Sequence, residues 1–165
     1  MQQLLKIRND YHRKGIPLEE LRILESLANE DPNTFRRLSQ RRVFDEPIAY
    51  LKGEVDFFGR KFNVDRRVYV PNKETENMVR LVLDELDRNS SILDVGTGSG
   101  CLAITIKREN PRVDVYGCDI SPSALEVAIQ NALKHKVSLA FFEGCYVDDL
   151  DIEEPTHIIS DLPYG

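Results

Sequence analysis

The chain has 165 residues, a net charge of −6 and an ordinary hydrophobic share of 41%. This length predicts one domain with an appendage rather than two full domains. No apolar stretch is long enough to cross a bilayer, and the amphipathic N-terminus lacks the apolar core of a signal peptide, so we expect a cytoplasmic protein.

The spacing of cysteines and histidines argues against a disulfide framework and against a metal site. The cysteines are odd in number and far apart, and no CxxC pair is present. The three histidines are scattered, so we predict no metal centre. We expect the cysteines to be small buried side chains: Cys101, Cys118 and Cys145.

Charge is unevenly distributed along the chain. Residues 1–67 hold 14 Lys and Arg against 11 Asp and Glu, a charge of +3, whereas residues 68–165 hold 8 against 17, a charge of −9. The acidic part disfavours stable binding of nucleic acid. The basic run of Arg36, Arg37, Arg41 and Arg42 is either a contact for a partner or RNA, or a solvated helix face, and we favour the helix face.

The N-terminal part is predicted to contain three helices. Apolar residues at helical spacing indicate a helix over 3–14 that Gly15 ends, a second that Pro17 opens and a third that begins at Asp31-Pro32. We expect them to form a small helical unit over residues 1–45.

Residues 46–73 change from helical to alternating spacing. Apolar residues alternate around a Gly turn, through Phe57-Phe58-Gly59 and then over 61–64 and 67–70. This pattern predicts a β-hairpin linker. Helical spacing returns over 74–88.

Strands and helices alternate from Ser90 onward. Short apolar strands are predicted at 92–95, 113–118, 139–142 and 157–160, with helices at 99–109 and at 121–135, the latter capped by Ser121. Strands separated by helices of this length imply a parallel α/β sheet with crossovers. We expect residues 74–165 to form one domain.

The strongest motif is Asp94-Val95-Gly96-Thr97-Gly98-Ser99-Gly100, between a predicted strand and a predicted helix. Glycines let the backbone turn sharply and approach a ligand, and the helix N-terminus offers free N–H groups. The motif therefore predicts a nucleotide-like cofactor, but it does not distinguish a dinucleotide from S-adenosylmethionine (SAM).

Two further motifs follow the next predicted strands. Asp119 ends its strand about 20 residues downstream, where a carboxylate can accept both hydroxyls of a ribose. The alternative role for Asp119 is a helix cap, for which Ser121 is better placed. Asp161-Leu162-Pro163-Tyr164 ends the fourth strand, where an acceptor, a stiff turn and a flat ring can hold a planar amide or base.

These motifs together resemble a class I SAM-dependent amino-methyltransferase, whose family pattern at the last motif is Asn/Asp-Pro-Pro-Tyr. The upstream segment EPIAYLKGEVDFFGRKFNVDRRVYVPNKETE is similar to the linker of HemK-type release-factor glutamine-N5 methyltransferases. The resemblance covers residues 35–165. It implies a Rossmann-like sheet preceded by the helical unit and the hairpin linker.

The resemblance also implies a role for each matching residue. Asp161, Pro163 and Tyr164 would receive the glutamine amide of a release factor that carries a Gly-Gly-Gln segment. The SAM contacts would come from Asp94, Gly96, Thr97, Gly98, Gly100, Asp119, Ile120, Cys145, Pro71, Glu74 and Thr75.

Several positions depart from the family pattern. The family usually has Asn and Pro where Asp161 and Leu162 stand, and Arg-Pro in place of Asn72-Lys73. It commonly has Asp, contacting the adenine amine, where Cys145 stands. These departures leave two alternatives open: an adenine-N6-type nucleobase methyltransferase, which Asp161 fits, and a non-catalytic remnant that binds SAM or a partner. A dehydrogenase would leave DLPY and the linker unexplained.

The chain ends at Gly165, just after the fourth predicted strand, whereas the resemblance implies about three more strands. We therefore expect a fragment or a degenerate relative, with a sheet that is incomplete at its C-terminal side. Such a chain would bind the cofactor weakly, lack activity and self-associate through an open edge at the strand holding Ile158 and Ile159.

Overall fold

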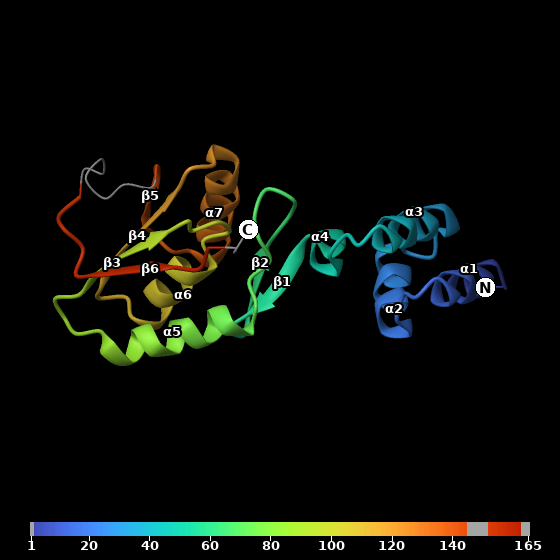
Figure 1. Ribbon diagram of the computed structural model, residues 1–165, viewed down its shortest axis with the longest axis horizontal. Helices are drawn as coiled ribbons and strands as arrows, with labels where there is room; N and C mark the ends of the chain where they lie inside the picture. Colours follow the sequence, from blue (N-terminus) through green and yellow to red (C-terminus); the bar gives the residue numbers. More distant parts are fainter. Residues whose placement is uncertain (1, 145–151, 163–165) are drawn as a thin grey trace. The chain divides into compact units, whose positions relative to one another are not determined.

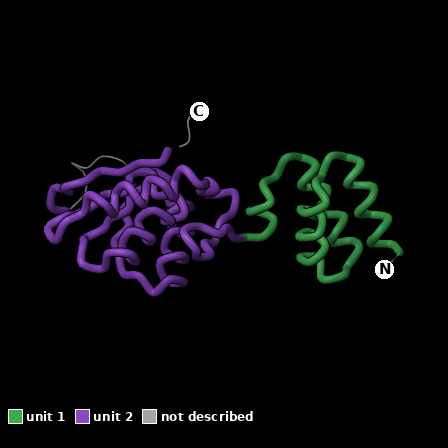
Figure 2. Tube along the Cα trace, turned by 90° about the horizontal axis from the view of Figure 1, so that it is seen from below, with its two compact units in different colours: residues 1–53 green, residues 54–165 purple. Residues whose placement is uncertain are grey.

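The computed structural model describes residues 2–144 and 152–162, and the chain divides into two compact units, residues 1–53 and 54–165 (Figure 2). Within the described residues, no helix is both long and apolar enough to span a membrane. The domain boundaries predicted at residues 45 and 73 stay predictions.

The first unit is helical, as predicted. It contains α1 (Gln2–Arg13), α2 (Leu18–Leu27), α3 (Pro32–Val43) and a short α4 (Ile48–Lys52) that the sequence did not reveal. Asp31 caps α3 by accepting hydrogen bonds from the N–H groups of Asn33 and Thr34. The apolar faces meet in a core of Ile7, Ile16, Leu21, Leu24, Ala28, Phe35, Leu38 and Leu51.

Two arginines of the basic run on α3 form ion pairs within this unit. Arg42 pairs with Glu20 at 2.6 Å, and Arg41 pairs with Glu46 at 2.6 Å. For these two arginines, the ion pairs support the interpretation of the run as a helix face, because each positive charge is paired with a glutamate of the same unit.

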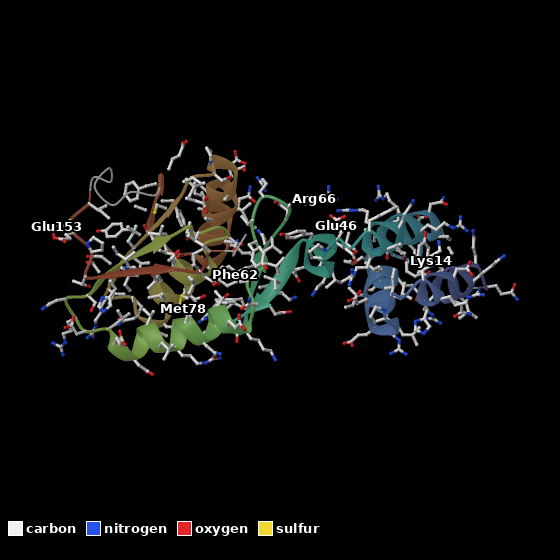
Figure 3. All side chains as sticks on the ribbon, in the orientation of Figure 1. Lys14, Glu46, Phe62, Arg66, Met78 and Glu153 are labelled. Carbon is white, nitrogen blue, oxygen red and sulfur yellow. The ribbon has the colours of Figure 1, made fainter. Side chains whose placement is uncertain are left out.

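The predicted hairpin is present and short. Strand β1 (Glu54–Phe57) pairs antiparallel with β2 (Arg60–Asn63). The two residues between them, Phe58 and Gly59, have φ angles of 48° and 71°, the left-handed pair that a tight hairpin turn requires. The ring of Phe62, labelled in Figure 3, is buried and meets Phe57 edge to face at 5.8 Å. Residues 67–70, predicted to alternate like a strand, are not a strand.

The sheet is parallel, with strand order β5-β4-β3-β6 (Figure 1). Its strands are β3 (Ser91–Val95), β4 (Asp114–Asp119), β5 (Ala140–Glu143) and β6 (His157–Ser160). The α/β class and the Rossmann-like order agree with the prediction. Among the described residues, β6 pairs with β3 alone, and Ile158 is exposed whereas Ile159 is buried.

Three helices pack on one face of this sheet: α5 (Lys73–Glu85), α6 (Cys101–Glu109) and α7 (Pro122–His135). Side chains alternate along each strand, so Ile92 and Val115 join the helix-covered core while Leu93 and Cys118 lie on the other face. This arrangement fixes the carboxyl ends of β3, β4 and β6 side by side, where parallel sheets bind ligands.

Candidate functional site

The segment from Asp94 to Gly100, here called the glycine loop, turns at the carboxyl end of β3. Its three glycines have φ angles of 73°, 53° and 75°, a left-handed backbone that other residues rarely adopt. The N–H groups of Gly96 and Thr97 both donate to the carbonyl of Cys118, at 2.8 and 2.9 Å. The loop is therefore anchored to the end of β4 before any ligand binds.

Two adjoining hollows lie over this loop and share Tyr69, Gly96, Gly98 and Asp161. The first is also lined by Pro71, Thr75, Thr97, Ser99, Cys101 and Leu102. The second is also lined by Arg67, Val68, Val95, Asp119, Ile120, Ser121, Ala124 and Leu162. We call the two hollows together the crevice.

Asp119 stands at the rim of the crevice with both carboxylate oxygens oriented by backbone. Oδ2 accepts from the N–H of Gly98 and Oδ1 from the N–H of Ser121, each at 2.9 Å. The cap of α7 is Ser121, whose side chain accepts from Ala124. A carboxylate has about four acceptor positions, so each oxygen of Asp119 can accept another hydrogen bond.

Asp94 lies beneath the glycine loop and lines neither hollow. Its side chain is buried, accepts from the hydroxyl of Thr97 at 2.7 Å and is hydrogen-bonded by the N–H of Ala103. Burial raises the pKa of this carboxyl to about 6, with Asp161 and Asp119 adding repulsion, although its hydrogen bonds act against the shift. Asp94 therefore supports the loop from below.

Gly100 also faces away from the crevice. A Cβ on Gly100 would lie 2.9 Å from Ile104 Cδ1 and 3.2 Å from Ala128 Cβ, so this glycine permits α6 and α7 to approach. At Gly98, by contrast, a Cβ would meet only the carbonyl of Gly96, at 3.9 Å. The two glycines thus serve different purposes, one in packing and the other at the open surface.

Strand β6 brings Asp161 to the crevice. There the hydroxyl group of Thr75 donates a hydrogen bond to Asp161 Oδ2. Thr75 is buried in the first turn of α5 and belongs to a capping box with Asn72, whose side chain accepts from the N–H groups of Glu74 and Thr75. The substitution of Asn for the family's Arg at position 72 thus supplies a helix cap.

The linker forms the remaining wall. Tyr69 is exposed and lines both hollows, and Pro71 lines the first, whereas Glu74 is exposed and lines neither. Cys101 lies at the start of α6, where burial raises the pKa of its thiol to about 12. That thiol stays protonated near neutral pH, so it is not an activated nucleophile.

The structure brings most of the predicted site residues together: Gly96, Thr97, Gly98, Asp119, Ile120, Pro71, Thr75 and Asp161. Three predicted residues lie outside the described residues: Cys145, Pro163 and Tyr164. In the part that is described, no cluster of His, Cys, Asp and Glu could hold a metal ion.

Tyr69 and Asn131 are among the residues of this region that sequence reasoning missed. Tyr69 reads as one of several alternating apolar positions, and only the fold turns it toward the crevice. Asn131 is buried in α7, and an amide inside an otherwise apolar helix face was the signal that could have identified it.

Comparison with known proteins agrees with this geometry. A family model described as "Methyltransferase domain" matches residues 86–160. Release factor glutamine methyltransferase from Neisseria gonorrhoeae is 40% identical over 85% of this chain and 52% of its own length. The Staphylococcus aureus protein of the same name is 39% identical over 76% of this chain and 46% of its own. The chain therefore spans about half the length of the curated relatives it matches.

Solved structures support the fold. The tRNA (uracil-54, C5)-methyltransferase of Pyrococcus abyssi, crystallised with S-adenosyl-L-homocysteine, superposes with a TM-score of 0.55 and 20% sequence identity. The match covers 67% of this chain and 28% of that protein. At this identity the likeness concerns the arrangement of strands and helices.

Proposed function

We propose that this chain, which belongs to the HemK-type methyltransferases, binds SAM and takes part in methylating the side-chain amide of a glutamine in a release factor. The observation that carries the proposal is the meeting of Asp119, the glycine loop and Asp161 at one crevice. Relatives named for this reaction, at up to 40% identity, support the choice of acceptor.

The residues present fit SAM. The rim carboxylate of Asp119 suits the two ribose hydroxyls, because each oxygen can accept a hydrogen bond beyond the one it receives from backbone. Gly96 and Gly98 expose backbone without side chains, which suits the methionine end. When bound, SAM would supply an electrophilic methyl group on a sulfonium, and an acidic crevice suits that positive charge.

Asp161 would receive the acceptor. An amide nitrogen is a poor nucleophile because its lone pair is delocalised into the carbonyl. Hydrogen bonds from the NH2 group to the Asp161 carboxylate would hold the nitrogen in one orientation, and Thr75 keeps that carboxylate in place. The contribution of these residues is then mainly alignment of the acceptor nitrogen for in-line transfer.

Pro163, Tyr164 and Cys145 enter the proposal through the family pattern, because they lie outside the described residues. Tyr164 would give the amide a flat face and Pro163 would stiffen the turn. Cys145 would stand near the adenine. Ile120 is exposed and lines the second hollow, where it would contact the nucleoside.

Calorimetry with S-adenosylhomocysteine (SAH) tests the cofactor assignment. Deleting the 2′-hydroxyl of the ligand should weaken binding to the wild-type chain by about ten-fold or more, since it removes a hydrogen bond to a charged group. The same deletion should have no effect on Asp119→Ala, because the partner is already gone. Equal losses in both proteins would contradict the ribose role of Asp119.

Methyl transfer from labelled SAM tests the acceptor. With this chain completed by the further strands that the family pattern implies, we expect label on a release factor that carries a Gly-Gly-Gln segment and none on adenine-containing DNA. Label on DNA alone would support the nucleobase alternative, which the carboxylate of Asp161 permits. Binding of SAH without transfer to either acceptor would support the non-catalytic alternative.

A further inference from the structure

Asn131 is a buried amide in the C-terminal half of α7, on the face that carries the buried residues Ala128 and Ala132. Burying an amide costs free energy unless its donors and its acceptor are paired. A side chain of this kind therefore has a specific set of partners to satisfy.

Every polar atom of Asn131 is paired with backbone. Its Oδ1 accepts from the N–H of Asn63 at 2.7 Å. Its Nδ2 donates to the carbonyl of Asn63 at 3.0 Å and to the carbonyl of Ser99 at 2.8 Å. An amide supplies one acceptor and two donors, so no other side chain of this shape satisfies the same three bonds.

The two partners belong to different parts of the crevice. Asn63 ends β2 and leads into the linker wall, residues 63–71, which carries Tyr69 and Pro71 into the hollows. Ser99 belongs to the glycine loop and lines the first hollow. One side chain therefore connects the wall of the crevice to its floor.

Neighbouring residues of α7 hold the hairpin but not the loop. Lys134 donates to the Asn63 side chain at 2.7 Å, and a ring nitrogen of His135 lies 3.1 Å from the carbonyl of Lys61. Neither of these contacts reaches the glycine loop. They provide the comparison that separates docking of the hairpin from the connection made by Asn131.

We propose that Asn131 is a positioning residue that sets the spacing between the linker wall and the glycine loop, and thereby the width of the crevice that receives the cofactor. The inference rests on the proposed function for the identity of the ligand. The connection itself can be tested without a ligand, so the two can fail separately.

The variants are Asn131→Asp and Asn131→Ala, with Lys134→Ala as the matched control on the same helix. The aspartate keeps the shape of the side chain but loses both donors and places a negative charge against two carbonyl oxygens. The alanine removes all three bonds without adding charge. A second control, Val113→Ala, removes a buried group just before β4, at the end of that strand away from the glycine loop. This variant shows what lowered stability alone does to exchange and affinity.

The first measurement is amide hydrogen exchange of the ligand-free protein. Both Asn131 variants should speed exchange at Val68 of the wall and at Gly96 and Thr97 of the loop, whose N–H groups are hydrogen-bonded within these segments or to β4. Lys134→Ala should leave the loop amides unchanged. Val113→Ala should show no preference for the two segments over the rest of the second unit.

The second measurement is SAH affinity by calorimetry beside the midpoint of thermal unfolding. Both Asn131 variants should bind SAH about ten-fold or more weakly, because the loss of two or more hydrogen bonds allows the wall and loop to separate. Lys134→Ala should bind SAH with an affinity within about two-fold of wild type. Val113→Ala should do the same, even when its unfolding midpoint is equal to or lower than that of the Asn131 variants.

Failure of the wild-type chain to bind SAH would overturn the proposed function, and the exchange experiment would still decide the role of Asn131. Should both Asn131 variants keep wild-type exchange at Gly96 and Thr97, the positioning role is wrong. It is equally wrong if Val113→Ala, at the same unfolding midpoint, loses as much SAH affinity as the Asn131 variants.

Discussion

The two sides of the crevice are built in different ways. The glycine loop is held mainly through its own N–H groups, which donate to the Cys118 carbonyl and the Asp119 carboxylate, while Asp94 supports it from beneath. The proposed acceptor side, at the end of β6, depends on side chains, chiefly the contact of Thr75 with the exposed Asp161. The cofactor side thus rests on several hydrogen bonds, whereas the proposed acceptor side rests chiefly on one.

The largest expected effect is on the packing of the glycine loop. Gly100→Ala should lower the free energy of unfolding by about 2–4 kcal/mol, since it adds a methyl group against Ile104 and Ala128 at a left-handed residue. Gly98→Ala should cost only about 1–2 kcal/mol, the backbone strain alone, because its Cβ would meet only the Gly96 carbonyl, at an ordinary contact distance of 3.9 Å. Urea unfolding measures both, and equal costs would contradict the difference in role.

A somewhat smaller effect is expected on the acceptor side. In the completed protein, Thr75→Val should lower the rate of methyl transfer by about 10- to 100-fold, since it removes a hydrogen bond worth about 1.5–3 kcal/mol to a charged acceptor. Thr75→Ser keeps the hydroxyl and should restore most of the rate. SAH affinity should change less than the rate in both variants. An equal loss with serine would show that the hydroxyl is not what matters.

The buried carboxyl of Asp94 gives the loop a pH dependence. Its pKa is raised from 3.8 in the unfolded chain to about 6, so the folded protein binds the proton more tightly and this group favours folding as pH falls from 7 to 4. Asp94→Asn should remove that gain, which is on the order of 2 kcal/mol. Urea unfolding of both proteins at pH 4 and 7 measures it, and a parallel pH dependence would refute the assignment.

The smallest expected effect is the loss of stability when a helix cap is removed, compared between one cap in each unit. Asn72→Ala and Asp31→Ala each remove a cap and should each cost about 1 kcal/mol in the free energy of unfolding. In the completed protein, only Asn72→Ala should also slow methyl transfer, because its cap includes Thr75. Equal rates in the two variants would show that the capping box does not position Thr75.

The sequence by itself determined the elements and the main motif. Helical spacing, Asp31-Pro32 and Ser121-Pro122 located three helices near their observed bounds, and the strand at 157–160 matches β6. The motifs at 94–100, 119 and 161 follow strands, and strand ends of a parallel sheet meet at one edge. These features are local, or they follow from the rule that the carboxyl ends of parallel strands meet at one edge. The sequence was therefore sufficient to predict them.

Only the tertiary structure decided which residues face the ligand. Asp94 and Gly100 belong to the motif, yet one is buried beneath the loop and the other serves helix packing. Thr75 reaches Asp161 across 86 positions of sequence, and Asn131 reaches Asn63 across 68. Such contacts arise from long-range packing that no local spacing encodes. A change in the pairing register of one strand, or in one crossover connection, would give the same side chains other partners.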